Sequence, residues 1–218
     1  MNRFILKHKY LVTFAILAVL AWVVYRVFSA GGSGLIPFVI VAVVVWGLGT
    51  VVFIYFWPPM TYGAYKRAIV RHGLGGDPIP VNTLYAVPNL ASPLASDSSL
   101  LATGTRDVLY VGGLLDLSKG PQVMHAPDFS GRYYSVQFTD PSDGANFAYV
   151  GTRTTGTEAG NYLVSGPGWK GSVPDGVKLI SSPNNSVLVV GRVLVYSDSD
   201  LPTAYGLSKQ IQLTPLSQ

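Results

Sequence analysis

The sequence predicts a transmembrane hairpin of two helices at the N-terminus, followed by a mainly antiparallel β domain, either a sandwich or a partly open barrel. Two observations predict this fold class. The chain of 218 residues is 49% hydrophobic and only 12% charged, which is too apolar for a soluble domain, and the excess lies in the first sixty positions. The remainder consists of short runs rich in Val, Tyr and Phe separated by Gly, Pro, Asp and Asn, as in antiparallel sheets.

The apolar region, residues 1–60, divides into two candidate membrane helices, residues 4–28 and 35–57. A bilayer core about 30 Å thick requires about 20 apolar residues in a helix. The glycine- and serine-rich residues 29–34 suit a tight turn between the helices. Pro58-Pro59 is expected to end the second helix, because proline removes a helical hydrogen bond. The first apolar run is longer than a signal-peptide core, so we expect a retained helix.

The charges around the hairpin predict its orientation, because cytoplasmic flanks carry an excess of Lys and Arg. We therefore expect a two-pass protein of an inner, cytoplasmic-type membrane, with a cytoplasmic N-terminus. The β domain is expected in the cytoplasm, and an extracytoplasmic domain is the alternative. The turn has only Arg26 near it, whereas the two ends of the hairpin carry Arg3, Lys7, Lys9, Lys66, Arg67 and Arg71.

The apolar runs at residues 10–25 and 35–57 contain no Asp, Glu, Lys, Arg or His, which argues against ion or proton transport. Gly47 and Gly49 would let another helix approach closely and would then form a helix-packing surface. The alternative is that glycine is simply common in membrane helices. The expected partners are the lipid bilayer and other membrane protein subunits.

Residues 61–81 are predicted to be a juxtamembrane basic segment and linker, helical around residues 64–72, and residues 82–218 the β-rich soluble domain. A short helix is expected at residues 200–207, capped by Asp200 or Ser199. Strands are expected at residues 108–111, 133–138, 147–150, 162–164 and 186–194.

Several classes of function are excluded or unsupported by composition. The net charge is +4, but the basic residues are scattered, so nucleic acid is not an expected partner. The absence of cysteine excludes disulfides and thiolate chemistry. His125 has no second histidine nearby, which leaves zinc and catalytic-triad interpretations without support. We predict no cofactor, no metal site and no catalytic residue.

The soluble part contains a series of ordered motifs, including Arg106-Asp107-x-Leu109-Tyr110, Asp116-Leu117-x-x-Gly120-Pro121, Gly131-Arg132-Tyr133-Tyr134-x-x-Gln137, Gly151-x-Arg153-x-Thr155-Gly156 and Gly166-Pro167-Gly168-Trp169-x-Gly171. Through these motifs, the chain resembles the domain-of-unknown-function 1254 family from about Asn82 to the end. The resemblance implies no activity. Longer members look like exported β-rich proteins with a following 1214 domain of unknown function, and we expect this chain to lack that second domain. The chain also departs from the family where Gly104-Thr105-Arg106-Asp107-Val108 stands in place of Pro-Asn-x-Asp-Thr.

Four aspartates could act as an acid, a base or ligands of a hard cation, namely Asp107, Asp116, Asp140 and Asp143. Each lies beside a turn residue or a strand end, where aspartate commonly accepts hydrogen bonds from backbone amides. We favour this structural role.

Arg132, Arg153 and Arg192 each follow glycine closely and could bind a carboxylate or phosphate bidentately. We favour the alternative, an internal salt bridge with Asp107, Asp116 or Asp140. The adjacent tyrosines of Tyr133-Tyr134 should point to opposite faces of a strand. The candidate residues for binding a ligand or partner are therefore Arg106, Asp107, Tyr110, Asp116, Arg132, Tyr134, Arg153, Trp169 and Arg192.

Two functional hypotheses follow. In the favoured one, the chain is a membrane-anchored accessory or scaffold subunit that docks its β domain onto a larger membrane protein complex. In the alternative, the β domain is a small-molecule-binding protein or an enzyme of unknown reaction, with a pocket formed by Arg132, Arg153, Asp107 and Tyr110. A cleft that joins these side chains would favour the second hypothesis, and their scattering would oppose it.

Overall fold

The computed structural model describes residues 18–19, 21–23, 25–26, 29, 35–73, 78–90 and 105–216. The chain divides into two compact units, Met1–Met60 and Thr61–Gln218, which are treated separately below. The predicted first membrane helix, residues 4–28, and the turn after it lie mostly outside the described residues.

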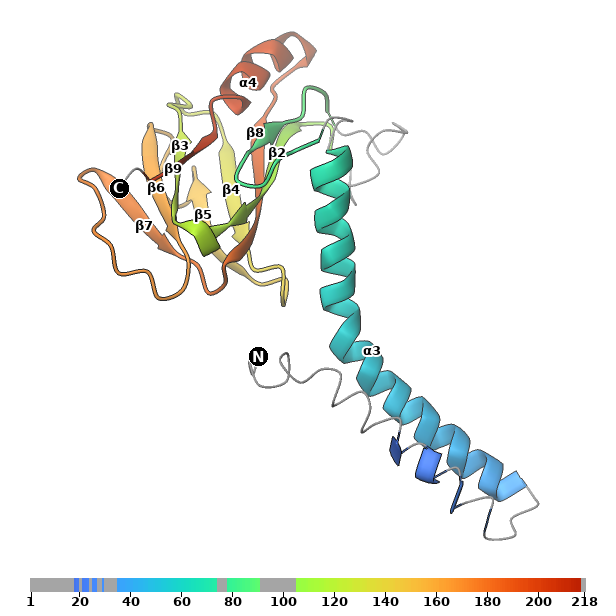
Figure 1. The fold of residues 1–218 in the computed structure, drawn as a ribbon. Coiled ribbons are helices and arrows are strands. Elements are labelled where there is room, and N and C mark those ends of the chain that lie inside the picture. The colour runs from blue at the N-terminus through green and yellow to red at the C-terminus, as the bar shows by residue number, and fades with distance from the viewer. Residues whose placement is uncertain are drawn as a thin grey trace. The chain divides into compact units, whose positions relative to one another are not determined.

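Helix α3, Leu35–His72, is the one helix in the described part of the chain with the length and apolar composition needed to cross a membrane (Figure 1). Large apolar side chains such as Phe38, Trp46 and Ile54 are exposed along it. The predicted end of this helix at Pro58-Pro59 is wrong, because α3 continues through the proline pair to His72. An interior proline removes a backbone hydrogen bond and crowds the carbonyl four residues earlier, but this cost is local, and the residues beyond Thr61 gain packing against the β domain.

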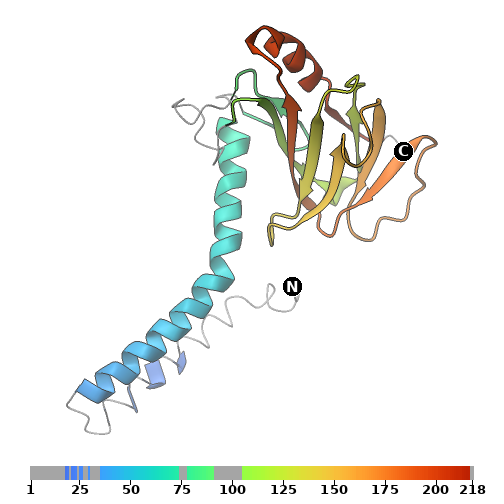
Figure 2. The ribbon, with the colours of Figure 1, turned by 180° about the vertical axis from the view of Figure 1, so that it is seen from behind.

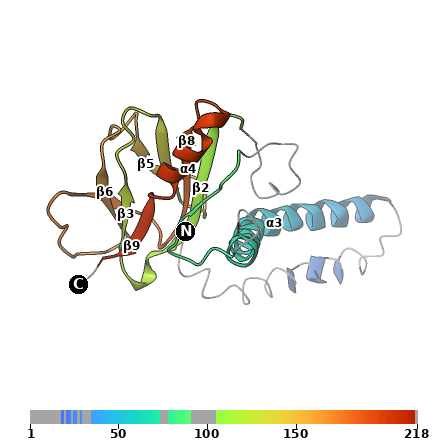
Figure 3. The same cartoon turned by 90° about the horizontal axis from the view of Figure 1, so that it is seen from above.

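The predicted mainly antiparallel β domain is confirmed, with two separate sheets that do not close into a barrel. One sheet has the strand order β1-β2-β8-β4-β5 and the other has the order β7-β6-β3-β9 (Figures 1 and 3). Among the strands in the described residues, β6 and β7 alone pair in parallel. The strands are β1 Tyr85–Ala86, β2 Val108–Asp116, β3 Gln122–Ala126, β4 Tyr134–Thr139, β5 Asn146–Gly151, β6 Gly160–Ser165, β7 Val177–Ser181, β8 Ser186–Leu194 and β9 Gln212–Pro215.

The main core lies between the two sheets. Leu109 and Val136 from the five-stranded sheet are buried in one cluster with Met124 and Tyr162 from the four-stranded sheet. Burial along β8 alternates residue by residue, which gives that sheet an inner face in the core and an outer face away from it. Helix α4, Leu201–Ser208, lies over one end of the sandwich (Figures 1 and 3) and buries Ala204 in the same cluster. Short 3₁₀ turns occupy Leu117–Lys119 and Asp198–Asp200.

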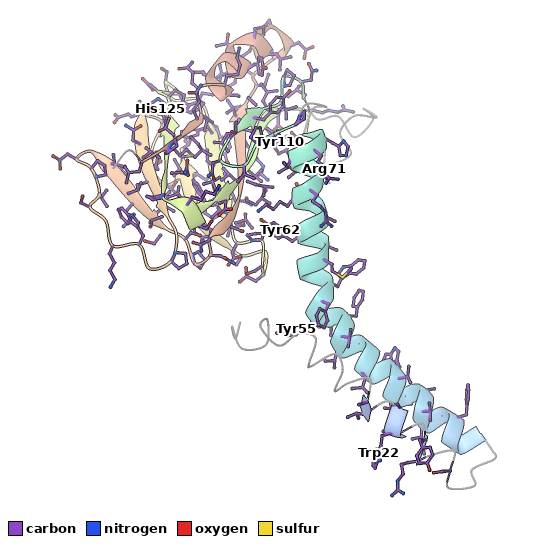
Figure 4. The ribbon with its side chains drawn as sticks, in the orientation of Figure 1. Trp22, Tyr55, Tyr62, Arg71, Tyr110 and His125 are labelled. Carbon is purple, nitrogen blue, oxygen red and sulfur yellow. The ribbon has the colours of Figure 1, made fainter. Side chains whose placement is uncertain are left out.

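The outer face of the five-stranded sheet is covered over β2, and we call this part the covered half. Strand β2 is buried at every position except its last, so both of its faces are packed. Leu114 forms a cluster with Ile69 of α3 and with Ile79, each no more than 2% exposed. Tyr110, which precedes Leu114 on β2 (Figure 4), packs with Val87 on the same face. The C-terminal part of α3 therefore belongs to the β domain.

Candidate anion-binding pocket

Four residues form a row across the outer face of the five-stranded sheet. Arg192 on β8 pairs with Tyr110 on β2 and with Ser135 on β4, and Ser135 pairs with Gly151 on β5. Directly opposed residues in antiparallel strands project to the same face of a sheet. The order of these strands, β2, β8, β4 and β5, can be followed in Figure 2, where β8 is orange-red and β4 and β5 are yellow-green to yellow.

The two small residues of this row form the floor of a pocket of about 540 Å³, which we call the sheet pocket. Gly151 has φ +151°, and a Cβ atom there would overlap the carbonyl oxygen of Tyr134 and the Cα of Ser135. Only glycine is tolerated at such a position. The sheet is therefore hollowed at its β4–β5 side because two neighbouring positions lack a large side chain.

Tyrosines stand on either side of this floor. Tyr133 lies directly before β4, two residues ahead of Ser135, and Tyr149 precedes Gly151 by two residues on β5. Both tyrosines line the sheet pocket. Residues two apart on a strand share a face. Tyr149 is 47% exposed, so part of its ring is open to a ligand.

Arg153 enters the sheet pocket from a tight turn that follows β5. The carbonyl oxygen of Gly151 accepts hydrogen bonds from the amides of Thr154, Thr155 and Gly156, at 2.9, 2.9 and 3.2 Å. The Gly151 amide in turn donates to the Thr155 hydroxyl at 3.0 Å. The guanidinium carbon of Arg153 lies 5.6 Å from the centroid of the Tyr133 ring, within cation–π range. The turn thus holds the backbone of Arg153 in place, although its side chain is exposed.

Arg192 enters the sheet pocket from the opposite side, and its side chain is half-buried. Its guanidinium carbon lies 5.7 Å from the Tyr110 ring centroid, and its Nη1 donates to Gln137 Oε1 at 3.4 Å. None of the described residues that line the sheet pocket is acidic. Two guanidinium groups with planar sets of donors therefore face one hollow, an arrangement suited to carboxylates or phosphates.

Comparison with known proteins identifies the family of the β domain. The family profile described as "Protein of unknown function (DUF1254)" matches residues 81–215, which include every strand of both sheets. The chain belongs to the DUF1254 family. A search of curated proteins finds no match.

Solved structures agree with the fold of this DUF1254 domain. The crystal structure of the VPA0106 protein from Vibrio parahaemolyticus matches with a TM-score of 0.56 and 24% identity, over 75% of this chain and 37% of that one. A crystal structure of an uncharacterized protein from Burkholderia cenocepacia matches with a TM-score of 0.37 and 11% identity, over 93% and 59%. The chain thus spans less than two thirds of either protein. The first match shows a shared fold, and the second carries no argument.

Arg132 of the DUF1254 domain lies apart from the sheet pocket, in an internal ion pair. Its Nη1 and Nη2 donate to the two carboxylate oxygens of Asp200 at 2.5 and 2.7 Å, and Nη1 also donates to the Leu194 carbonyl at 2.7 Å. An internal salt bridge was the favoured expectation, but its partner is Asp200 and not Asp107, Asp116 or Asp140. The hydrogen bond from Arg132, with another from the Tyr196 amide, lowers the pKa of Asp200 to about 2.

The predicted aspartates take structural positions. Asp116, Asp140 and Asp143 each accept a hydrogen bond from the backbone amide two residues later, at 3.0, 2.8 and 2.8 Å. The bonds from Ser118 lower the pKa of the Asp116 carboxyl. Arg106 and Asp107 are exposed just before β2 and do not line the sheet pocket. The predicted pocket of Arg132, Arg153, Asp107 and Tyr110 is therefore not formed as a unit, because only Arg153 of the four lines the hollow.

The two adjacent tyrosines point to opposite faces, as the strand alternation predicts. Tyr133 lines the sheet pocket, whereas the Tyr134 ring stacks on Phe129 in the core, with centroids 3.9 Å apart. Burial raises the pKa of Tyr134 to about 12. Tyr134 thus lines the sheet pocket mainly with its backbone atoms. One ring of this pair was expected to face outward, but Tyr134 was the predicted binding residue, and the outward ring is that of Tyr133. Ser135 and Tyr149 were missed, although alternation from the buried Tyr134 identifies Ser135 as outward-facing.

The remaining candidates lie elsewhere. Trp169 lines a second hollow of about 610 Å³ together with Lys119 and Leu216. His125 lies on β3 in the other sheet (Figure 4), with Nδ1 2.9 Å from Asn161 Oδ1. Gly47 and Gly49 on α3 have open space where a Cβ would project. No group of three or more His, Cys, Asp or Glu side chains suited to a metal occurs among the residues with described positions.

Proposed function

We propose that this DUF1254 domain binds a small organic anion in the sheet pocket and that α3 anchors the chain in a membrane. The observation that carries the binding proposal is the row in which Arg192 borders the floor of Ser135 and Gly151, with Arg153 beyond it. A pocket of about 540 Å³ lies in the range of about 300–1,000 Å³ that small-molecule sites occupy.

The physical argument rests on charge and desolvation. A guanidinium group in a half-buried site attracts an anion more strongly than one in bulk water, because the local dielectric constant is lower. Arg192 is half-buried, is held by Gln137 and has no acid beside it in the described lining of the pocket. A carboxylate over the Ser135–Gly151 floor would supply the missing negative charge.

Titration calorimetry on the purified full chain in mild detergent tests this proposal, with succinate, terephthalate, benzoate and phenyl phosphate as probes. We expect at least one anion to bind, and Arg192→Gln to weaken that binding at least about tenfold, because a charge-assisted hydrogen bond is lost. Arg106→Gln is the matched control, since it removes the same charge from an exposed site outside the pocket. Binding by none of the probes, or equal loss in both variants, would contradict the proposal.

A second candidate function, the accessory subunit, is supported by α3 itself. Its exposed apolar side chains and the open space at Gly47 and Gly49 suit contact with lipid or with another membrane helix. Mild-detergent extraction at the natural level, followed by size separation, tests it. Stoichiometric co-migration with a larger assembly that is lost in Gly47→Leu/Gly49→Leu supports this function, and migration alone opposes it.

We further propose the two-pass topology with a cytoplasmic β domain, supported by the cations that flank the apolar region. The natural chain has no cysteine, so single cysteines report cleanly. A membrane-impermeant thiol reagent added to intact cells should label Ser33→Cys in the turn and label Lys170→Cys in the β domain only after lysis. The reverse pattern would establish the extracytoplasmic alternative.

A further inference from the structure

The sheet pocket has two positive charges, held apart. We propose that its ligand is a small dicarboxylate, whose first carboxylate binds Arg192 and whose second carboxylate binds Arg153. This inference rests on the proposed anion-binding function and names the class of anion.

The separation of the two arginines follows from the strand order. Arg192 projects from β8 and Arg153 from the turn after β5, and β4 lies between these two strands. Two inter-strand spacings of about 4.8 Å place the two backbones roughly 10 Å apart. Each guanidinium also rests on a different ring, Arg192 on Tyr110 and Arg153 on Tyr133. These contacts keep the guanidinium groups on opposite sides of the floor, so two anionic groups fit better than one.

The charge balance leads to the same ligand class. In the described part of the chain, Arg132 has the acid partner Asp200, whereas the described lining of the sheet pocket offers no acid to Arg153 or Arg192. A monoanion would neutralise one guanidinium and leave the other without a partner. A dicarboxylate would neutralise both, and each planar carboxylate matches the planar donor set of a guanidinium.

The two arginines should contribute unequally. Arg192 is half-buried on a central strand and is hydrogen-bonded to Gln137, whereas Arg153 is exposed on a turn. Exposed ion pairs are worth about 0.2–1 kcal/mol, so the second carboxylate should improve the affinity by up to about fivefold. Arg192 would then bind the carboxylate of any ligand, and Arg153 would favour ligands that carry a second carboxylate. The partly exposed ring of Tyr149 is available to pack against the carbon skeleton between them.

Matched ligand pairs test this division on the full chain in mild detergent. Terephthalate and benzoate share a ring, and succinate and butyrate share a carbon chain, but only one member of each pair is a dicarboxylate. We expect terephthalate, whose two carboxylates point in opposite directions, to bind up to about fivefold more tightly than benzoate. Arg153→Gln should abolish that ratio and should weaken benzoate binding less than Arg192→Gln does. Arg192→Gln should weaken both ligands, and Arg106→Gln should change neither.

The outcomes separate this inference from the function it rests on. If no probe binds, the anion-binding function itself is wrong. If benzoate binds as tightly as terephthalate and both are lost in Arg192→Gln, the function stands and the dicarboxylate inference is overturned. Tighter binding of phenyl phosphate than of terephthalate would also overturn it, because both arginines would then bind a single anionic group. Near-ultraviolet circular dichroism of each variant confirms that folding is retained.

Discussion

The covered half of the five-stranded sheet and the sheet pocket occupy the same outer face but have opposite chemistry. Over β2, the apolar side chains of Leu114 and Tyr110 are sealed by Ile69 of α3 and by Val87. Over β4 and β5, the face carries Ser135 and Gly151 with arginines and tyrosines around them. The difference teaches that one half of this face stabilises the domain, while the other half is left available for a ligand.

The three arginines that closely follow a glycine, Arg132, Arg153 and Arg192, also differ in their surroundings. Arg132 has an internal carboxylate partner in Asp200, and its side chain is only 10% exposed. All three guanidinium groups lie over tyrosine rings, but Arg153 and Arg192 do so beside the pocket, whose described lining contains no carboxylate. Three arginines in similar local sequence thus have different roles, so their removal should affect stability and binding differently.

The largest expected effect is on the covered half. Leu114→Ala removes a side chain that is 2% exposed, and we expect it to lower the free energy of unfolding by about 2–5 kcal/mol. Tyr149→Ala, in the sheet pocket, should cost about 1 kcal/mol or less because the ring is already 47% exposed. Urea unfolding of the full chain in detergent measures both, and equal losses would contradict the distinction between the two halves.

Removal of the internal arginine should have the next largest effect. Arg132→Gln breaks the bidentate contact with Asp200 and the bond to the Leu194 carbonyl, and we expect a loss of about 1.5–3 kcal/mol in unfolding free energy. The same change at Arg153 should stay within about 0.5 kcal/mol, since that side chain is exposed. The same urea titration compares them, and a similar loss at Arg153 would show that it also supports the fold.

Acid should weaken the Arg132–Asp200 pair in a defined pH window. The pKa of Asp200 is lowered from 3.8 to about 2 in the folded domain, so its stabilising contribution is fully present above about pH 4 and is lost as the pH falls toward 2. The midpoint temperature of thermal unfolding should therefore fall more steeply between pH 5 and pH 2 in the natural chain than in Asp200→Asn. Parallel curves for the two proteins would show that this carboxylate does not couple to folding.

Arg192→Gln should lower the stability of the domain less than Arg132→Gln does. This substitution removes a cation–π contact with Tyr110 and a long hydrogen bond to Gln137, which together should cost less than about 1 kcal/mol. The variant should nevertheless lose anion binding in calorimetry. A stability loss as large as that of Arg132→Gln would place Arg192 among the structural arginines and would remove the contrast between the two groups.

Much of the β domain was predictable from the chain itself. Residues 186–194 were expected as a strand and form β8 with the same bounds, because alternating Val residues mark one buried face. The short strands β1, β3, β7 and β9 were missed, since they have weak alternation or few residues. The end of α3 was misplaced at Pro58-Pro59, because tertiary packing beyond Thr61 outweighs the local cost of proline.

The candidate site was predictable only in its parts. Arg153 and Arg192 stood out beside glycines, and Gly151 belonged to a recognised motif, but nothing local indicated that they share one hollow. Strand alternation marks Ser135 only as outward-facing, and Tyr149 had no distinguishing signal, because the position of both in the pocket depends on the strands that pair beside them. Arg132 had the same local appearance as Arg192, and only the position of Asp200 distinguishes the two.

The sequence by itself determined a long apolar helix, a mainly antiparallel β domain and membership of the DUF1254 family, because composition, alternation and ordered motifs are local properties of the chain. The tertiary structure decided which half of the sheet is covered and which arginines remain available to a ligand. Those outcomes depend on the pairing of strands that are far apart in the sequence. Because β4 lies between β8 and β5, Ser135 and Gly151 lie between Arg192 and Arg153.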